Sequence, residues 1–300
     1  MTDAGTGAVA DALRDGVAAS HVDSVGLVAL IGPDAVSFLQ SLASQDLDGM
    51  RVGETRHSLL LEPQGKLTAD FRVLRAGDDE LWLRCEPSVA SLLTASLSRF
   101  RIRVKVDIDD RSERTAAIAL RGPGAHAVAI QVPAGVHDLA LDWPGNPGRE
   151  LVGPSEAVDA IDLGDIPIVG PAELEILRIE CGVPRQPIDI DERTIAQEAF
   201  LERTAVSFAK GCFLGQELVC RIDTRGHVNR LLRILHAEAP LAAGASVSDG
   251  DGKTVGTVTS ATVSPRHGPI ALATLRREVA IGATVHAGAI GATVHEVQNL

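Results

Sequence analysis

The chain has 300 residues, of which 45% are hydrophobic and 23% are charged, a composition typical of a folded protein with room for two or three domains. Its formal net charge of −12 argues against a general affinity for nucleic-acid backbones or acidic membranes. No apolar run approaches the roughly eighteen residues that cross a bilayer, and the N-terminus lacks the basic start and apolar stretch of a signal peptide. These features predict a cytoplasmic protein with no nucleic-acid or membrane partner.

The four cysteines indicate a reducing compartment. Cys85, Cys181, Cys212 and Cys220 contain no CxxC pair, so their spacing is that of neither a disulfide framework nor a zinc site. All except Cys212 lie within apolar strand or helix patterns, where a free thiol packs as a small hydrophobic residue. We therefore expect free thiols and no bound metal.

The first part of the chain mixes strand and helix signals. An apolar strand ends at Gly32-Pro33, which also begins a helix with its apolar residues on one face. Polar turns separate three further strands, and a proline opens a second helix. The expected elements are strands at 24–31, 57–61, 66–74 and 81–85 and a helix at 87–100.

A pattern of this first part returns later in the chain. LVALIGPDAVSFL at 27–39 has a counterpart in AIALRGPGAHAVA at 117–129, and in both an apolar strand meets Gly-Pro and turns into a helix. We interpret the repeat as two related α+β subdomains, 1–112 and 113–230, although strand–turn–helix junctions of this kind are common in unrelated proteins. The middle region also holds a helix at 171–182, with proline in its first turn and glycine at its end.

Beyond residue 230 the pattern becomes glycine-rich and strand-like. The hexapeptide IGATVH occurs at 281–286 and again at 290–295, as expected for adjacent strands of a small barrel. The sequence thus predicts an α+β protein with two related α+β subdomains and a C-terminal β-barrel at 231–300.

The densest group of chemically active residues is KGCFLGQE at 210–217. A helix is expected to begin near Gly215, which places Cys212 just ahead of a helix N-terminus and two residues from Lys210. Both features stabilise a thiolate, so we predict a reactive thiol at Cys212 supported by Lys210. The alternative for Cys212 is a buried, inert thiol.

Two arginines follow at helical spacing. Arg221 and Arg225 are four residues apart and hence on one face of the expected helix. Such a pair can bind a carboxylate through parallel N–H bonds, or it can pair with Glu217 on a solvated face. The sequence leaves both alternatives open.

The segment KGCFLGQE with these arginines closely resembles the signature KGCYxGQE of the YgfZ-type folate-binding proteins, relatives of the glycine-cleavage T-protein (aminomethyltransferase). LLLEPQGKLTADFRVLR at 59–75 resembles the family's N-terminal hairpin, and LRIECGVPRQPIDIDE at 177–192 resembles a superfamily segment reading RxEAGxPxxGxDxD. Residues 255–277 resemble the superfamily's C-terminal barrel, so the likeness covers nearly the whole chain. It implies three lobes around a central tetrahydrofolate pocket.

The resemblance also assigns residues to folate. Glu180 matches the glutamate of RxE and would bind the aminopyrimidine edge of the pterin, because a carboxylate accepts two parallel N–H bonds from that edge as it does from a guanidinium. Arg221 and Arg225 would suit the glutamate tail, and Gln216 and Phe213 belong to the same folate-binding signature. Phe213 replaces the more usual tyrosine and so lacks its hydroxyl.

For function, the resemblance implies a folate-dependent role in making or repairing iron–sulfur clusters, with iron–sulfur client proteins as transient partners. Cys212 would act as a redox thiol, as a transient sulfur or cluster contact, or as a nucleophile toward a one-carbon adduct. No set of cysteines has cluster spacing, so a stably bound cluster is not expected.

Whether the chain is an enzyme is open at this stage. Aminomethyltransferases use an aspartate after a strand of the N-terminal half, and the stretch 85–106 that we take as its counterpart has none, Glu86 being its only acid. We therefore expect a folate-binding accessory protein. The alternatives are a folate-dependent aminomethyltransferase or other one-carbon transferase, and a scaffold in which KGCFLGQE is only a loop–helix junction.

Overall fold

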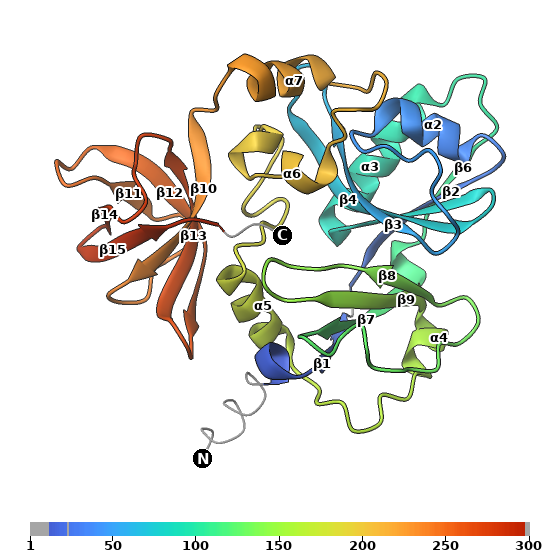
Figure 1. Ribbon diagram of the computed structural model, residues 1–300, viewed down its shortest axis with the longest axis horizontal. Coiled ribbons are helices and arrows are strands. Elements are labelled where there is room, and N and C mark those ends of the chain that lie inside the picture. Colours follow the sequence, from blue (N-terminus) through green and yellow to red (C-terminus); the bar gives the residue numbers. More distant parts are fainter. Residues whose placement is uncertain (1–11, 23, 298–300) are drawn as a thin grey trace.

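The computed structural model describes residues 12–22 and 24–297, which form three lobes. Two of the lobes are built on sheets and lie one above the other, and a β-barrel stands beside them (Figure 1). Short helices of the middle region lie between the barrel and the sheets. No helix in the described part of the chain is long and apolar enough to span a membrane.

The first lobe is an antiparallel sheet with two helices on one face. Phe38 and Leu39 of the first helix and Leu93 and Leu97 of the second pack against alternate residues of the strands. The second helix begins with Pro87, as expected from the sequence. The sheet order is β3-β4-β5-β2-β6, formed by β2 (Gly26–Ile31), β3 (Thr55–Leu61), β4 (Leu67–Gly77), β5 (Glu80–Cys85) and β6 (Asp107–Asp110), with α2 (Ala35–Leu42) and α3 (Pro87–Phe100).

The second lobe is a smaller antiparallel sheet. Its first strand comes from the range 1–112 that the sequence assigns to the first subdomain, so this strand crosses the predicted boundary, and the boundaries themselves stay predictions. The short helix α4 packs on the outer face through Val158. The sheet order is β1-β7-β9-β8, formed by β1 (Ala18–Val22), β7 (Thr115–Arg121), β8 (His137–Ala140) and β9 (Gly148–Pro154), with η1 (Ser112–Arg114) and α4 (Ser155–Asp159).

The two Gly-Pro pairs occupy equivalent positions, at the ends of β2 and β7. Gly32 and Gly122 both have positive φ, 140° and 113°, and a Cβ at either would lie within 2.6 Å of a backbone oxygen. Only the first pair starts a helix. After Gly122 the chain makes successive turns, so the second predicted helix is wrong. Gly124 lowers helix propensity there, and its N–H donates to the carbonyl of Gly16 in the N-terminal segment.

The inner faces of the two sheets pack together. Leu27, Leu74 and Trp82 of the first sheet contact Leu139 and Val152 of the second in one apolar cluster. Because side chains alternate along a strand, the central strands bury both faces, one against helices and one against the opposite sheet. The two lobes therefore share a single layered body.

The third lobe is a closed barrel of six strands. The two IGATVH segments form β14 and β15, which pair antiparallel with Val285 opposite Ala292, as predicted. Leu235, Val258 and Val294 point into the barrel core. Its strands are β10 (Arg230–Ala237), β11 (Ser246–Ser248), β12 (Thr254–Ser264), β13 (Gly268–Arg276), β14 (Thr284–Ala287) and β15 (Ile290–His295).

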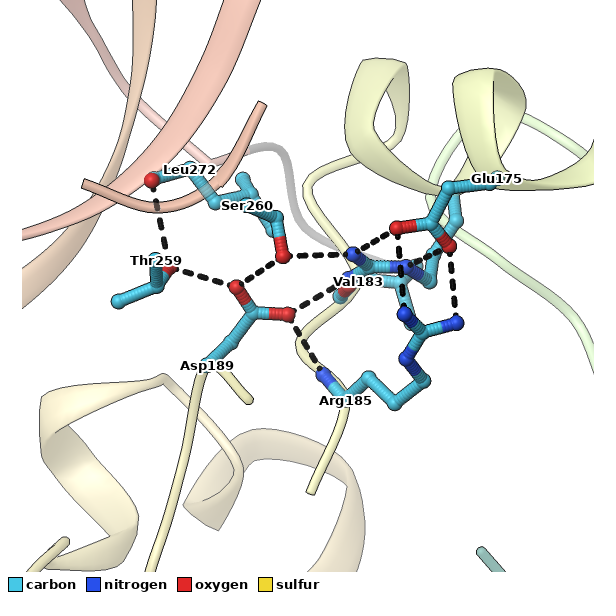
Figure 2. Close-up of polar contacts among 8 residues, drawn as sticks. Glu175, Val183, Arg185, Asp189, Thr259, Ser260 and Leu272 are labelled. Atoms are coloured by element: carbon cyan, nitrogen blue, oxygen red, sulfur yellow. Dashed lines mark hydrogen bonds and ion pairs between the residues drawn. The ribbon is translucent and has the colours of Figure 1, made fainter. Parts of the chain in front are cut away.

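A buried polar network attaches the middle region to the barrel (Figure 2). The carboxylate of Asp189 is fully buried and accepts hydrogen bonds from Arg178 Nη1 at 2.8 Å, Ser260 Oγ at 2.7 Å and Thr259 Oγ1 at 2.5 Å. Arg178 also forms two bonds to Glu175. Arg178 and Asp189 thus hold the middle region against the barrel. The middle elements are α5 (Pro171–Glu180), η2 (Ala196–Glu198), α6 (Glu202–Ala205) and α7 (Gln216–Arg225).

Candidate functional site

The lysine of the signature is an anchor between lobes. Lys210 Nζ donates hydrogen bonds to the carbonyl oxygens of Gln40 and Ala43, both at 2.7 Å, and of Gln45 at 3.0 Å. These carbonyls lie at and just beyond the end of α2, where the last helical oxygens lack partners within the helix. Burial lowers the pKa of Lys210 to about 8, and nearby aspartates only partly oppose this. Lys210 therefore fixes the signature loop to the first lobe.

Two further signature residues shape the loop itself. The ring of Phe213 is buried in an apolar cluster with Leu59 and Leu61. An apolar ring suits this environment without the hydroxyl of the more usual tyrosine. Gln216 Oε1 accepts a hydrogen bond from the backbone N–H of Phe213 at 3.1 Å. In this structure both residues serve the local fold, and their contact with folate stays a prediction.

The signature loop lies directly against the turn between β3 and β4. Gly215 has φ 79°, and a Cβ there would lie 2.5 Å from the carbonyl oxygen of Glu62. Gly65 has φ 76°, and a Cβ there would lie 2.7 Å from Cβ of Leu218. Glycine at both positions allows this close approach. The N-terminal hairpin and the signature, distant in sequence, thus form one contact.

Cys212 is the exposed thiol of the protein. Cys85 and Cys181 are buried, which raises the pKa of each thiol to about 12, and Cys220 is half-buried on α7. Cys212 stands three residues before the N-cap Gly215. The neighbouring ammonium of Lys210 is directed to carbonyl oxygens, so the activated thiolate stays a prediction. Across residues 12–22 and 24–297, no group of three or more His, Cys, Asp or Glu side chains is placed to hold a metal ion.

The arginines of α7 face solvent. Arg221 forms an ion pair with Glu217 one turn earlier, and both side chains are more than half exposed. Arg225 is also exposed. For Arg221 the structure shows the second alternative left open by the sequence, pairing on a solvated face.

A separate cavity lies where the lobes meet. Its walls come from β3 and β4, from the turn at 142–144, from the segment 182–184 after α5, and from 199–204 around α6. None of the predicted site residues lines it. The residues that give it chemical character are His57, Asp70, Arg72, Trp143, Phe200 and Arg203.

Asp70 is one of the acids that line this cavity. His57 Nε2 lies 2.5 Å from Asp70 Oδ1, and His57 Nδ1 lies 2.8 Å from Thr204 Oγ1. Burial raises the pKa of Asp70 to about 7. A carboxyl group of this kind exchanges its proton near neutral pH, so it can accept a proton from a bound amine or donate a hydrogen bond to it.

The strand that bears Asp70 is held by a side chain. Gln186 Oε1 accepts a hydrogen bond from the N–H of Asp70, and Gln186 Nε2 donates to the carbonyl of Thr68, both at 3.0 Å. The amide therefore pairs with the backbone of β4 as a neighbouring strand would. This fixes the direction of Asp70.

Asp70 is an aspartate of this cavity that was not singled out from the sequence. The acid was sought only in 85–106, most of which forms α3 on the opposite face of the sheet. The available signal was the hairpin strand LTADFRV, in which Asp70 and Arg72 are the charged residues of an otherwise apolar run, two positions apart and so on one face.

Glu180 lies outside the lining of the cavity and already binds a guanidinium. Arg14 Nη2 lies 2.5 and 2.7 Å from the two carboxylate oxygens, and Arg14 Nε lies 3.3 Å from the second. The hydroxyl of Ser264, at the end of β12, donates a further hydrogen bond to this carboxylate. The guanidinium of Arg14 thus makes the hydrogen bonds to Glu180 that the sequence analysis assigned to the pterin.

Comparison with known proteins agrees with this architecture. The GCVT N-terminal domain family matches residues 2–141, and the C-terminal beta-barrel domain of CAF17 matches residues 229–298. An aminomethyltransferase from Nostoc sp. (strain PCC 7120) is 27% identical over 88% of this chain and 78% of its own length. The tRNA-modifying protein YgfZ of Edwardsiella ictaluri is 30% identical over 69% of this chain and 67% of its own length.

A solved structure shows the same fold. Aminomethyltransferase T of the glycine cleavage system from Bartonella henselae superposes with a TM-score of 0.83, covering 98% of this chain and 89% of that one at 23% identity. The family matches and the curated relatives place the chain in the glycine-cleavage T-protein superfamily, as the sequence predicted. Within this superfamily the chain belongs to the YgfZ family.

Proposed function

We propose that the chain binds a reduced folate where its three lobes meet and serves iron–sulfur proteins as an accessory factor, with Cys212 as its reactive group. The observation that carries the folate half is Asp70, a half-buried carboxyl that lines the inter-lobe cavity beside His57 and whose pKa is raised to about 7. Reduced pterins present amines and N–H groups, and these need carboxylate partners. The YgfZ relatives, named for tRNA modification, support the family role.

In this proposal tRNA-modifying iron–sulfur enzymes are clients, and the chain does not bind tRNA itself. The net charge of −12 disfavours contact with a phosphate backbone. The proposed location is the cytoplasm, where such clients and reduced thiols occur together.

Folate binding through Glu180 requires Arg14 to move. Both carboxylate oxygens of Glu180 already accept bonds from Arg14, so the aminopyrimidine edge of a pterin cannot bind there at the same time. The exchange replaces the N–H groups of the Arg14 guanidinium by the parallel N–H pair of the pterin, so both carboxylate oxygens keep a donor. The pterin would thus displace the N-terminal segment from this carboxylate.

A second candidate function is one-carbon transfer, and Asp70 favours it. A carboxyl that titrates near neutral pH beside His57 meets the requirement for proton transfer to or from a reacting folate amine. The two functions depend on different residues. The accessory role depends on Cys212 in the exposed loop, and one-carbon transfer depends on Asp70 in the cavity.

The test is complementation of a bacterial strain that lacks its own YgfZ-type protein, with iron–sulfur enzyme activities as the readout. For an accessory factor, Cys212→Ser loses most of the rescue, while Cys220→Ser, a matched control on α7, keeps it. For a transferase, Asp70→Asn abolishes aminomethyl transfer by the purified protein and Cys212→Ser leaves it intact. Full rescue by Cys212→Ser would refute the role of the thiol.

A further inference from the structure

The inner face of the first sheet carries a row of basic side chains across its strands. Arg72 on β4 is opposite His57 on β3 and opposite Arg84 on β5. Phe71 and Val73, the neighbours of Arg72 in sequence, point to the helix-covered core. Arg72 therefore lies on the face that meets the second lobe, and it lines the cavity together with Asp70.

The neighbouring guanidinium groups of this interface have partners. Arg84 binds Glu150 through two hydrogen bonds of 2.8 and 3.1 Å. Arg121 lies over the ring of Trp143, 3.8 Å from its centroid, and donates to the carbonyl of Leu141. Arg72 differs, because within the described residues its guanidinium has no hydrogen bond, ion pair or ring contact.

The acids close to Arg72 are engaged elsewhere. Glu150 is held by Arg84. Asp142 accepts hydrogen bonds from the N–H of Gly148 at 2.8 Å and from His126 at 2.7 Å. Asp70 is bonded to His57. No acid in the cavity wall is therefore left to neutralise Arg72.

The guanidinium of Arg72 is half-buried in the cavity wall, where a charge without a partner is less well stabilised than in water. Burial lowers the pKa of Arg72 to about 10, and the charge of Arg121 adds to this, yet the group stays protonated at neutral pH. Structures retain such a charge where an anion completes it. The planar fork of arginine matches a carboxylate, which accepts two parallel N–H bonds from it.

We propose that Arg72 is the carboxylate-binding residue of the cavity. One carboxylate of the ligand accepts two N–H bonds from Arg72, and an amine or N–H of the ligand lies toward Asp70, two positions away on the same face. This inference deepens the proposed folate function, on which the identity of the ligand rests. The carboxylate belongs either to the glutamate tail of a folate or to a small free acid such as an amino acid, and it replaces Arg221 and Arg225 as the place where a tail is bound.

The first experiment compares two reduced pterins by anaerobic calorimetry. Tetrahydrofolate has the glutamate carboxylates, and 6-methyltetrahydropterin lacks them. Arg72→Gln should weaken tetrahydrofolate binding at least tenfold and change binding of the tail-less pterin less than twofold. Arg99→Gln, an exposed arginine of α3, is the control and should change neither. A tenfold loss for Arg225→Gln with none for Arg72→Gln would overturn the assignment.

Small acids distinguish the source of the carboxylate. Titrations with glycine and acetate should show binding to the wild type and none to Arg72→Gln if a free acid is the ligand, and this supports the site. Unchanged tetrahydrofolate affinity in Arg72→Gln, with no binding of glycine or acetate to the wild type, refutes it. If the wild type binds no folate, the proposed function fails, and the Arg72 site then depends on the small acids alone.

Stability separates binding from a structural role. Arg72→Gln removes a half-buried charge that has no partner among the described residues, so its melting temperature should be unchanged or higher than that of the wild type. Arg72→Lys keeps the charge without the fork and should bind tetrahydrofolate with intermediate affinity. A melting temperature clearly lowered in both variants would identify Arg72 as structural and overturn the proposal.

Discussion

The signature loop and the inter-lobe cavity differ in how their polar groups are satisfied. In the loop, Lys210 binds three carbonyl oxygens and Gln216 binds a backbone N–H, so the thiol of Cys212 is the group left exposed. In the cavity, Asp70 has a raised pKa, and Arg72 has no partner among the described residues. A specific sequence motif can therefore consist mainly of residues that hold the fold together. A candidate ligand site is indicated instead by ionisable groups that have a shifted pKa or lack a protein partner.

The largest effect expected from the loop concerns Cys212. Cys212→Ser should reduce rescue of iron–sulfur enzyme activities about tenfold or more, because a hydroxyl cannot replace a thiolate as nucleophile or sulfur contact. The melting temperature should not change, since the side chain is exposed. A comparable loss for Cys220→Ser would show that the phenotype is not specific to the loop.

The corresponding test near the cavity exchanges the partners of Glu180. Glu180→Ala should weaken tetrahydrofolate binding by about tenfold to a hundredfold, the loss expected when a charge-assisted bond is removed. Arg14→Ala should instead tighten binding, because the competing guanidinium is gone. Calorimetry measures both. Weaker binding in Arg14→Ala would make Arg14 part of the site, and unchanged affinity in Glu180→Ala would move the pterin elsewhere.

Lys210 provides a test in which stability and binding should separate. Lys210→Met leaves three carbonyl oxygens without their donor, which should cost about 1–3 kcal/mol of unfolding free energy. Denaturant unfolding measures this loss, and hydrogen exchange should rise in 210–216. Tetrahydrofolate affinity should stay within twofold. A large loss of tetrahydrofolate affinity in Lys210→Met would show that the signature loop, like the cavity, takes part in binding.

The last test is a pH dependence from Asp70. Because burial raises its pKa from 3.8 to about 7, the folded state binds more protons than the unfolded state between these values, and stability falls as the pH rises through this range. Asp70→Asn removes this decline. The melting temperature of the variant relative to wild type should therefore be higher at about pH 8 than at about pH 5, and a constant difference would argue against the raised pKa.

Local patterns in the sequence predicted much of the fold. The antiparallel pair β14–β15 follows from a repeated alternating hexapeptide, and the start of α3 from Pro87. The pairing of β1 with β7 could not be foreseen, because nothing local to Ala18–Val22 specifies a partner strand about a hundred residues away.

The site was predicted less completely than the fold. Cys212 is exposed and its reactivity stays a prediction, whereas Asp70 and Arg72, which line the cavity, were not singled out from the sequence. Alternation in β4 puts these two on one face, but whether that face is solvent, core or cavity depends on how the second lobe packs against it. The ion pair of Arg14 with Glu180 likewise depends on the final position of the N-terminal segment.

The contact between Gly65 and the signature loop has a thermodynamic consequence. The turn that holds Gly65 continues directly into β4, which carries Asp70, so the backbone that bears the cavity acid also contacts the loop that bears the exposed thiol. A ligand whose displacement of β4 reaches this contact would couple the two sites. Thermodynamic linkage then makes the coupling reciprocal. If bound folate changes the equilibrium constant for modifying Cys212 by some factor, modification of Cys212 changes the affinity for folate by the same factor.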